Sequence, residues 1–515
     1  MSGKTLTSKK FFQPIDRLAL GIILVLSLLI SIVLLTGSQV APRVRDFSWQ
    51  NKHVSADDTA FILTFSRPMN HGSVEDNLKL TPVLTNTEKT NSQDSKIKGK
   101  VSWAGRKMAY TLLSPLPYGS DYQLQLQGAQ EQLPGGGESK GRSIEPFTAS
   151  FRSRDRAFAY IGVEGEEQGR LILYNLTQQK KTVLTPPDLV VMDFKPYSDG
   201  DRILFSANDR QNEIKGLLTE QLYTVTTGLL FQVPGKRAAS PQSSGKITLI
   251  LDSKDYQNLQ FDLSGDGQTI VVQRVNRKNP AEFGLWILQA NAKPRPLDNQ
   301  PGGEFIISPD SASLAVLQGQ GVAILPLTPA AEPLDFLPKF GKVLSFSSDN
   351  STATMVKFNT DYTRSLFLVN NQGTERELLR TTGSIINCQF TPSKEKLYCL
   401  LTQLIKGEEY REEPFIATID LKTEPNIPTP VQPLVVLPEQ RDIQMSLSPD
   451  GLALLFDQVG TKPPLETDSL RTVDGQAIAT GRLWLLPIVD TINSEPSPQL
   501  QPEELLAGFH PRWIP

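Results

Sequence analysis

The 515-residue sequence is poor in the side chains on which metal and nucleophilic chemistry depends. It has two cysteines and three histidines, too few for a scaffold held by many disulfides or for a cysteine-rich zinc site. It also lacks an excess of charge of one sign, because 52 Lys and Arg stand against 55 Asp and Glu. With a formal net charge of −3, the chain has no overall positive charge to neutralise phosphates, so we expect no nucleic-acid partner.

Motifs of common catalytic sites are absent as well. The sequence has no G-x-S-x-G nucleophile elbow on a strand-to-helix turn, because its run of that pattern at 137–141 lies in a glycine-rich polar loop, and it has no H-E-x-x-H zinc motif. Its histidines, His53, His71 and His510, lie in segments that we assign to different parts of the fold. We therefore expect no catalytic residue, no metal site and no cofactor, and we interpret the chain as a protein that is not an enzyme.

A long hydrophobic run lies near the N-terminus. Residues 18–35 include no charged side chain, and four cations and one acid precede them. As a helix this run is about 27 Å long, close to the hydrocarbon thickness of a bilayer. Because cations stay on the cytoplasmic side, we predict a cytoplasmic tail at residues 1–17 and a single-pass anchor in the lipid bilayer of the inner membrane at residues 18–37. All later residues would then be extracytoplasmic or periplasmic.

Two alternatives to the anchor stay open. The first is a cleaved secretory signal, because Thr36-Gly37-Ser38 is a run of small residues suited to cleavage. The second is a buried helix of a soluble domain. The anchor is preferred because the tail is long and the apolar run exceeds the usual core of a signal peptide.

Residues 45–152 alternate apolar and polar side chains with the period of two that is typical of half-buried β-strands. Phe61, Leu63 and Phe65, for example, share one face of such a strand. Turn residues separate several runs of this kind within about a hundred residues, which favours a β-sandwich.

Two runs in this segment contain specific motifs. Phe61–Asn70 includes F-S-x-P-M, and Pro115–Tyr122 reads P-L-x-x-G-x-x-Y. With these runs in this order, the segment resembles the bacterial Ig-like domain named after the S-layer protein SbsA. The resemblance covers nearly all of residues 45–152 and implies a rigid structural or spacer module without catalytic residues.

The rest of the chain, residues 158–515, repeats a short signal in which an apolar residue precedes a turn of the Ser-Pro-Asp type. Each of the first six instances is followed by two further apolar strands, and this order of strands and turns is typical of a propeller blade. The seven instances are Phe194-Lys-Pro196, Leu263-Ser-Gly-Asp266, Ile307-Ser-Pro-Asp310, Phe346-Ser-Ser-Asp349, Phe390-Thr-Pro-Ser393, Leu447-Ser-Pro-Asp450 and Trp513-Ile-Pro515.

The two ends of this repeat are complementary. Residues 158–184 supply the later strands of a blade without an opening strand, whereas Phe509–Pro515 supplies an opening strand with nothing after it. Pairing them would close a ring of sheets. We therefore predict an all-β chain with an N-terminal transmembrane helix, an Ig-like β-sandwich and a seven-bladed β-propeller over residues 158–515, with six blades as the alternative.

Several short motifs place this half of the chain near a known family. They are the Ser308–Asp310 and Ser448–Asp450 turns, the L-W-x-L strands at 285–288 and 483–486, and the terminal P-R-W-I-P. With them the segment resembles the propeller of the envelope protein TolB and related WD-like propellers. The resemblance implies an extracytoplasmic interaction platform.

The two cysteines form the one candidate pair of site residues. If strands 386–390 and 397–401 pair so that Phe390 faces Leu397, then Cys388 faces Cys399, and a cross-strand disulfide fits the geometry. An extracytoplasmic location would permit the bond. Two buried thiols are the equal alternative, because free cysteine is common in protein cores.

Together these observations favour a membrane-anchored extracytoplasmic binding or scaffolding protein of the bacterial cell envelope, with an envelope protein or glycan as partner at the propeller face. One alternative is an envelope enzyme of the glycan hydrolase or lyase type, with carboxylates from separate blades at the channel mouth. Two carboxyl groups that converge there with raised pKa values would support it. The other alternative is a purely structural element of the cell wall or surface layer.

Overall fold

The structure is a computed structural model. It describes residues 14–37, 40–83, 97–132, 141–211, 219–229, 243–290, 292–297, 302–328, 334–405, 407, 411–422, 429–440, 442–465, 468–472, 475–488 and 501–515, and in the first helix it describes the side chains of residues 18–32. The predicted cytoplasmic tail, residues 1–17, lies largely outside these ranges. The described chain is almost entirely β-structure, which confirms the predicted all-β class.

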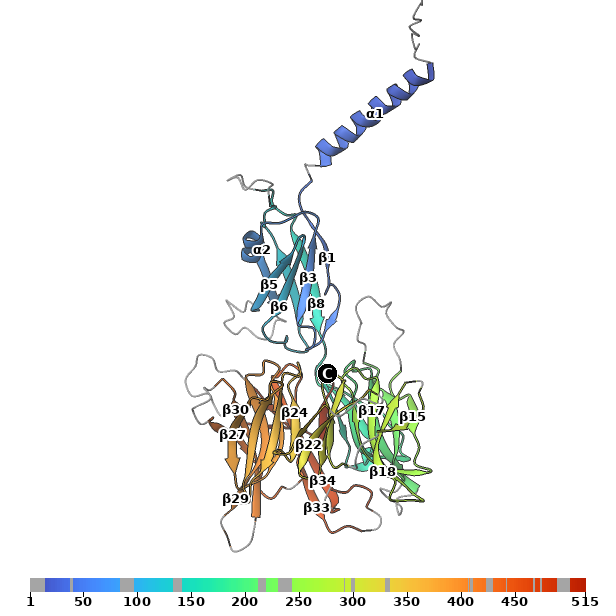
Figure 1. The fold of residues 1–515 in the computed structure, drawn as a ribbon, viewed down its shortest axis with the longest axis vertical. Helices are drawn as coiled ribbons and strands as arrows, with labels where there is room; N and C mark the ends of the chain where they lie inside the picture. Colours follow the sequence, from blue (N-terminus) through green and yellow to red (C-terminus); the bar gives the residue numbers. More distant parts are fainter. Residues whose placement is uncertain are drawn as a thin grey trace, which may run out of the picture.

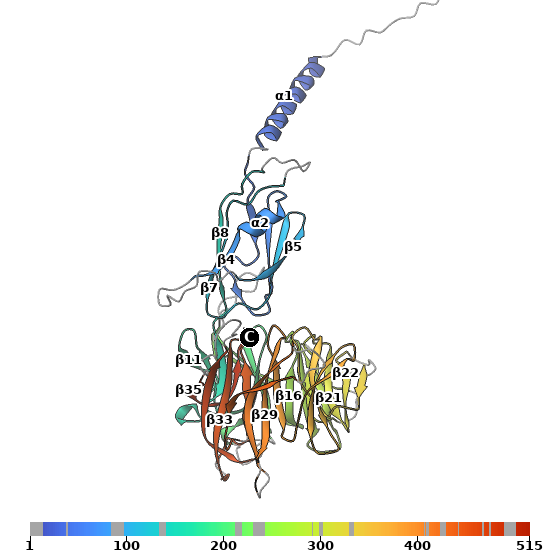
Figure 2. The same ribbon diagram turned by 90° about the vertical axis from the view of Figure 1, so that its left-hand side faces the viewer.

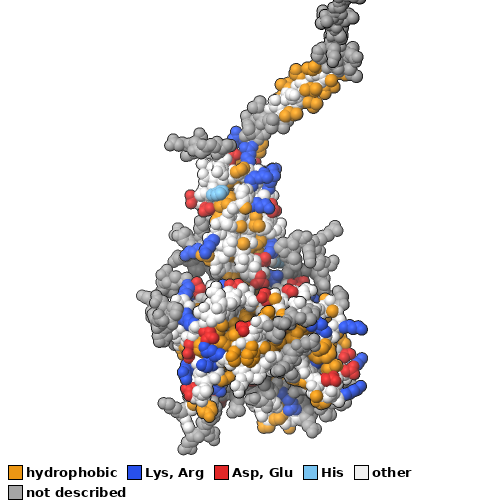
Figure 3. Space-filling model, in the orientation of Figure 1, with side chains coloured by type: hydrophobic (Ala, Val, Ile, Leu, Met, Phe, Trp, Pro, Cys, Tyr) orange, Lys and Arg blue, Asp and Glu red, His pale blue; other side chains and the backbone are white. Residues whose placement is uncertain are grey.

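Helix α1, Pro14–Gly37, extends away from the β-structure in Figures 1 and 2. Hydrophobic side chains cover its surface (Figure 3), and those from Leu18 to Ile32 are exposed. Within the described residues, no helix combines the length and the apolar character needed to cross a bilayer. The prediction of a single-pass anchor at residues 18–37, on which the inner-membrane and periplasmic placement rested, is therefore wrong.

The first globular part is a sandwich of two four-stranded sheets. In strand β3 the side chains of Phe61, Leu63 and Phe65 are buried and alternate with more exposed neighbours, as the period of two predicts. These side chains pack with Trp49 and Phe151 between the sheets. One sheet consists of β1 (Val44–Phe47), β3 (Ala60–Phe65), β6 (Lys107–Leu112) and β5 (Gly99–Ala104), and the other of β2 (His53–Val54), β8 (Phe147–Ser153), β7 (Asp121–Leu126) and β4 (Leu78–Pro82).

One short helix, α2 (His71–Asn77), lies between β3 and β4. The Asn70 side chain caps it by accepting a hydrogen bond from the backbone N–H of Ser73, which satisfies one of the free donors of the first turn.

Residues 157–515 form a ring of sheets below the sandwich (Figures 1 and 2). Among the described residues there are seven sheets of four antiparallel strands each. From the innermost to the outermost strand, the first three are β36 (Phe509–Trp513), β9 (Ala157–Ile161), β10 (Leu171–Asn175) and β11 (Lys180–Val183); β12 (Leu189–Pro196), β13 (Arg202–Asp209), β14 (Gln221–Thr226) and β15 (Ile247–Leu251); and β16 (Tyr256–Leu263), β17 (Thr269–Asn276), β18 (Phe283–Gln289) and β19 (Arg295–Pro296).

The other four sheets follow the same plan. They are β20 (Phe305–Ile307), β21 (Ser313–Gln318), β22 (Gly321–Pro326) and β23 (Asp335–Leu337); β24 (Lys342–Phe346), β25 (Thr352–Phe358), β26 (Arg364–Asn370) and β27 (Glu375–Thr381); β28 (Ile385–Phe390), β29 (Lys396–Ile405), β30 (Arg411–Asp420) and β31 (Val431–Val436); and β32 (Met445–Leu447), β33 (Ala453–Lys462), β34 (Ala477–Pro487) and β35 (Glu503–Ala507). Apolar residues from neighbouring sheets fill the layers between them.

The last strand of the chain completes the first sheet. Strand β36 pairs with β9, with Trp513 opposite Phe158. The ring of Trp513 meets that of Phe158 edge-on at 5.7 Å, and its Nε1 donates a hydrogen bond to the carbonyl oxygen of Ser446 at 3.0 Å. This pairing confirms the predicted closure of the ring by the two ends of the repeat.

In a Ser-Pro-Asp turn, the two carboxylate oxygens of the aspartate can accept hydrogen bonds from different partners. In the turn after β20, Asp310 Oδ1 accepts hydrogen bonds from the Ser308 hydroxyl and from the N–H of Ala312. Its Oδ2 accepts a hydrogen bond from Asn350, which lies in the corresponding turn of the next sheet, at 2.7 Å. The aspartate therefore closes its own turn and ties it to the neighbouring sheet.

Candidate binding site

The innermost strands of the seven sheets surround one cavity of about 570 Å³. In strand β12 the side chains of Asp193 and Lys195 line it, whereas Phe194 between them is buried in the packing between sheets. This alternation follows from the period of two of a strand with one face toward the channel. The other sheets contribute Gln260 to Asp262, Glu304 to Ile306, Ala315 to Leu317, Val322, Lys342 to Leu344, Ile386 and Asn387, Asp442 to Gln444, and Arg512.

Three ion pairs cross the boundaries between sheets along this wall. Asp193 Oδ1 lies 3.1 Å from Arg512 Nη2, which joins β12 to β36. Lys342 Nζ lies 2.7 Å from Glu304 Oε2, next to β20 and β24.

The third pair, Lys195 with Asp262, joins β12 to β16. Together with Asp442, the wall therefore presents fixed charges of both signs to the interior of the cavity.

A histidine reinforces the first of these pairs. His510 Nε2 lies 3.1 Å from Asp193 Oδ1 and 3.1 Å from Arg512 Nε. This nitrogen donates to the carboxylate when it carries a proton and accepts from the guanidinium when it does not. Burial by itself would raise the pKa of Asp193, but Arg512 and His510 outweigh it and hold this pKa well below its usual range. Asp193 is therefore a fixed anion in the wall.

Two carboxyl groups with raised pKa values lie behind the channel wall. Asp457, on β33, is 1% exposed and accepts hydrogen bonds from the N–H groups of Gln444 (2.7 Å) and His510 (2.6 Å). Burial raises its pKa to about 7. Burial likewise raises the pKa of Glu220, before β14, to about 8. The two groups belong to different sheets, and neither lines the cavity, so they do not form the converging pair that a glycan-cleaving site would need.

The structure separates the three histidines, with His53 in β2, His71 in α2 and His510 in β36. In the part of the chain that the structure describes, no group of three or more His, Cys, Asp or Glu side chains is placed to hold a metal ion.

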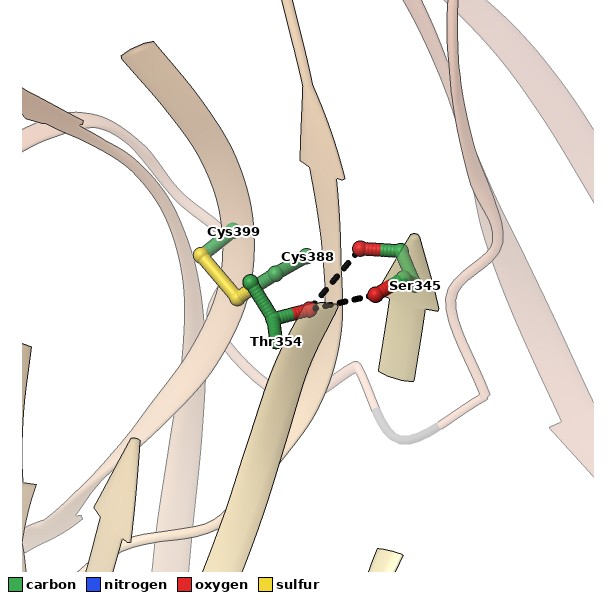
Figure 4. Close-up of a disulfide and its surroundings, with 4 residues drawn as sticks. All are labelled: Ser345, Thr354, Cys388 and Cys399. Atoms are coloured by element: carbon green, nitrogen blue, oxygen red, sulfur yellow. Dashed lines mark hydrogen bonds between the residues drawn. A yellow bond between two sulfur atoms is a disulfide. The ribbon is translucent and has the colours of Figure 1, made fainter. Parts of the chain in front are cut away.

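The cysteines lie in the sixth sheet, with their side chains away from the channel. Strands β28 and β29 pair Phe390 with Leu397 and Cys388 with Cys399, whose Cα atoms are 4.1 Å apart. Their sulfur atoms form a disulfide, which lies beside Thr354 of the neighbouring sheet (Figure 4). Both cysteines are fully buried in the layer between the fifth and sixth sheets.

The sandwich is fixed to the face of the ring where the Ser-Pro-Asp turns lie. Asp450, in the last of these turns, accepts hydrogen bonds from the N–H of Tyr118 in the sandwich (2.9 Å) and from Arg156 Nη2 in the connecting segment (2.8 Å). Arg154 Nη1 donates to the carbonyl oxygen of the terminal residue, Pro515, at 2.7 Å. The cavity residues Glu304 and Lys342 lie at the opposite ends of their strands from these turns. The channel mouth on their side therefore faces away from the sandwich.

Sequence reasoning did not find the charged residues of the channel. Arg512 and Asp193 are more than 300 positions apart, and neither strand's sequence indicates that the two residues meet. The signal that was present is the polar, apolar, polar order of Asp193-Phe194-Lys195, which is unusual for a strand that is buried on both faces.

Comparison with known proteins assigns the first globular part to a family. Residues 38–149 match the model of a bacterial Ig-like domain, which confirms the resemblance of this segment. No curated protein matches the chain.

Solved structures resemble the chain at low identity. A 6-phosphogluconolactonase-like protein from Bacteroides uniformis is 10% identical, with a TM-score of 0.42, and the match covers 70% of this chain and 99% of that protein. TolB from Acinetobacter baumannii is 10% identical, with a TM-score of 0.37 and coverage of 78% and 80%.

The interpretation that the chain is not an enzyme is corrected by these comparisons, because the similar structures include proteins named after 6-phosphogluconolactonase, one from Bacteroides uniformis and one from Bacteroides fragilis. With TM-scores of 0.42 and 0.41, they assign no activity to this chain. The chain thus joins a bacterial Ig-like domain, matched at residues 38–149, to a ring of antiparallel sheets whose structural neighbours include TolB.

Proposed function

We propose that the chain is an interaction platform of the bacterial cell envelope. In this proposal residues 158–515 are a seven-bladed propeller that binds a partner at the channel mouth facing away from the sandwich. Residues 45–152 are the module that holds the opposite face. The observation that carries the proposal is the single cavity of about 570 Å³ to which every one of the seven described sheets contributes. Rings of loops around such a cavity are common binding sites.

The chemistry of the wall indicates the kind of partner. Lys342, Glu304 and their counterparts in the other ion pairs present hydrogen-bond donors and acceptors together, beside apolar side chains that also line the cavity. A partner that inserts polar or charged groups can exchange hydrogen bonds with these pairs, whereas an apolar group would leave them without water and without replacement. We therefore propose a protein loop or a glycan of the envelope as the partner.

The proposal is tested by site-specific photo-cross-linking of the full chain in cells. p-Benzoyl-phenylalanine is placed at position 304 in the channel wall and, as the control, at position 362, where Tyr362 is exposed on the hairpin between β25 and β26. We expect a defined product from position 304 that is absent from position 362 and that weakens in the Lys342→Glu variant. Lys254→Glu, a charge reversal outside the channel, should leave the product unchanged. Equal products from both positions, or a product insensitive to Lys342→Glu, would contradict a binding site in the channel.

A further inference from the structure

In the part of the chain that the structure describes, the outermost strands of the seven sheets have unpaired edges, and six of them carry features that oppose pairing with another chain. Such features are charged side chains, proline and very short length. Strand β11 begins with Lys180-Lys181, β27 contains Glu375-Arg376-Glu377, β35 begins with Glu503-Glu504, β31 contains Pro433, and β19 and β23 have only two and three residues.

Strand β15, Ile247–Leu251, has none of these features. Its sequence, Ile-Thr-Leu-Ile-Leu, contains no charge and no proline, and Leu249 and Ile250 are 51% and 37% exposed. The register with β14 shifts at Ile250, so residues 247–249 form the regular part of the edge. Within the described residues, no strand pairs with the outer side of β15.

The backbone of β15 shows which groups this edge offers. The backbone groups of Lys246, just before the strand, point toward β14. Its carbonyl oxygen accepts a hydrogen bond from the N–H of Thr226, and its N–H donates a hydrogen bond to Thr226 Oγ1. Successive residues of a strand direct their backbone groups to alternate sides. Ile247 and Leu249 therefore direct theirs outward, where a further strand can bind.

The charges on either side of β15 indicate what that further strand is. Lys246 precedes the apolar run and Asp252 follows it. A second copy of β15, antiparallel and centred on Leu249, brings each Lys246 toward Asp252 of the other chain. A parallel copy would bring like charges together. Lys254 Nζ lies 3.8 Å from Asp252 on an exposed surface, where an ion pair contributes little.

We infer that the edge of β15 is a self-association surface, at which two copies of the chain pair antiparallel about a two-fold axis. Such an interface is isologous, so it closes at a dimer in which the β15 edges of both copies are paired. Because β15 is the outermost strand of its sheet and the channel is lined by innermost strands, the two surfaces are separate. The inference therefore goes beyond the proposed function. One short strand pair buries little area, so we expect a weak dimer that forms with increasing concentration.

The test is disulfide trapping in the full chain. Cys388 and Cys399 are bonded to each other, so Leu249→Cys adds a single thiol. We expect this variant to form a covalent dimer under mild oxidation. The control is Leu434→Cys, which is 40% exposed on the edge strand β31 beside Pro433 and should stay monomeric. Trapping at position 249 also distinguishes this edge from association through the exposed apolar residues of α1.

A charge exchange adds a second criterion that does not depend on the new thiol. In sedimentation velocity, Lys246→Asp should lower the dimer fraction, because it places two carboxylates together at each end of the strand pair. The double variant Lys246→Asp with Asp252→Lys should restore the dimer. The inference is overturned if Leu249→Cys is trapped no faster than Leu434→Cys, or if the dimer fraction does not respond to Lys246→Asp. Circular dichroism identifies any variant that fails to fold.

Discussion

Asp450 accepts a hydrogen bond from Arg156 Nη2 at 2.8 Å, and this contact joins the last Ser-Pro-Asp turn of the propeller to the segment that leads out of the sandwich. The carboxylate of Asp450 is fully buried, and it also accepts a hydrogen bond from the N–H of Tyr118. The same turn type that ties neighbouring sheets together thus ties the ring to the sandwich. Burial by itself would raise the pKa of Asp450, but Arg156 and the hydrogen bonds outweigh it and keep this pKa below its usual value.

Asp450→Asn should loosen the sandwich from the ring. The substitution keeps the shape of the side chain but removes the charge that faces Arg156, and hydrogen bonds to charged groups contribute about 1.5–3 kcal/mol. We expect a loss of stability in that range in urea unfolding, and faster proteolysis of the segment around residue 155. Asp310→Asn is the matched control, because the hydrogen bond that Asp310 Oδ2 accepts from Asn350 is exposed to solvent. An equal effect of both variants would show that Asp450 has no special role between the domains.

Trp513→Ala should open the ring at its closure. Trp513 is almost fully buried against Phe158 and is bonded to Ser446, and truncation of a large buried aromatic side chain costs about 3–5 kcal/mol. Hydrogen exchange should rise in β9 and β36 and stay unchanged in the sandwich. Trp103→Ala, in β5 of the sandwich, should show the reverse pattern. Unchanged exchange in β9 after Trp513→Ala would contradict closure by this strand.

Asp457 should make the ring less stable as the pH rises. Its folded-state pKa of about 7 lies above the ordinary value of 3.8, so the folded chain binds a proton more tightly than the unfolded chain. The stabilisation is therefore complete below about pH 4 and decreases as the pH rises toward 7. We expect the free energy of unfolding to fall over this window in the wild-type chain and to fall less in Asp457→Asn. Parallel pH profiles of the two proteins would show that Asp457 is ionised throughout.

Loss of the Cys388–Cys399 bond should destabilise the sixth sheet. The bond closes a loop of about a dozen residues, for which chain entropy gives about 2–3 kcal/mol. We expect the free energy of unfolding of a double Cys→Ser variant to be lower by this amount, so that the variant unfolds at a lower urea concentration. Dithiothreitol should lower the stability of the wild-type chain but not that of the variant. Titration of two free thiols in the unreduced wild-type chain would contradict the bond.

The sequence allowed the ring to be predicted but not the contents of its channel. Closure could be predicted because Phe509–Pro515 is an apolar strand without partners after it, and residues 158–184 lack the matching strand. The channel pairs could not, because whether Asp193 faces Arg512 depends on how seven sheets close around an axis. The N-terminal run was interpreted as a bilayer anchor from its hydropathy alone, whereas no helix within the described residues has the length and apolar character to cross a bilayer.

The most direct test uses the partner identified by cross-linking from position 304. Its affinity for the full chain is measured by calorimetric titration and compared with its affinity for two charge-reversal variants. If the partner binds in the channel, Lys342→Glu should weaken its affinity at least about tenfold, because the variant breaks the pair with Glu304 and places two carboxylates together in the wall. Lys254→Glu, on the outer surface, should leave the affinity unchanged. Equal affinities for the wild-type chain and Lys342→Glu would place the partner outside the channel.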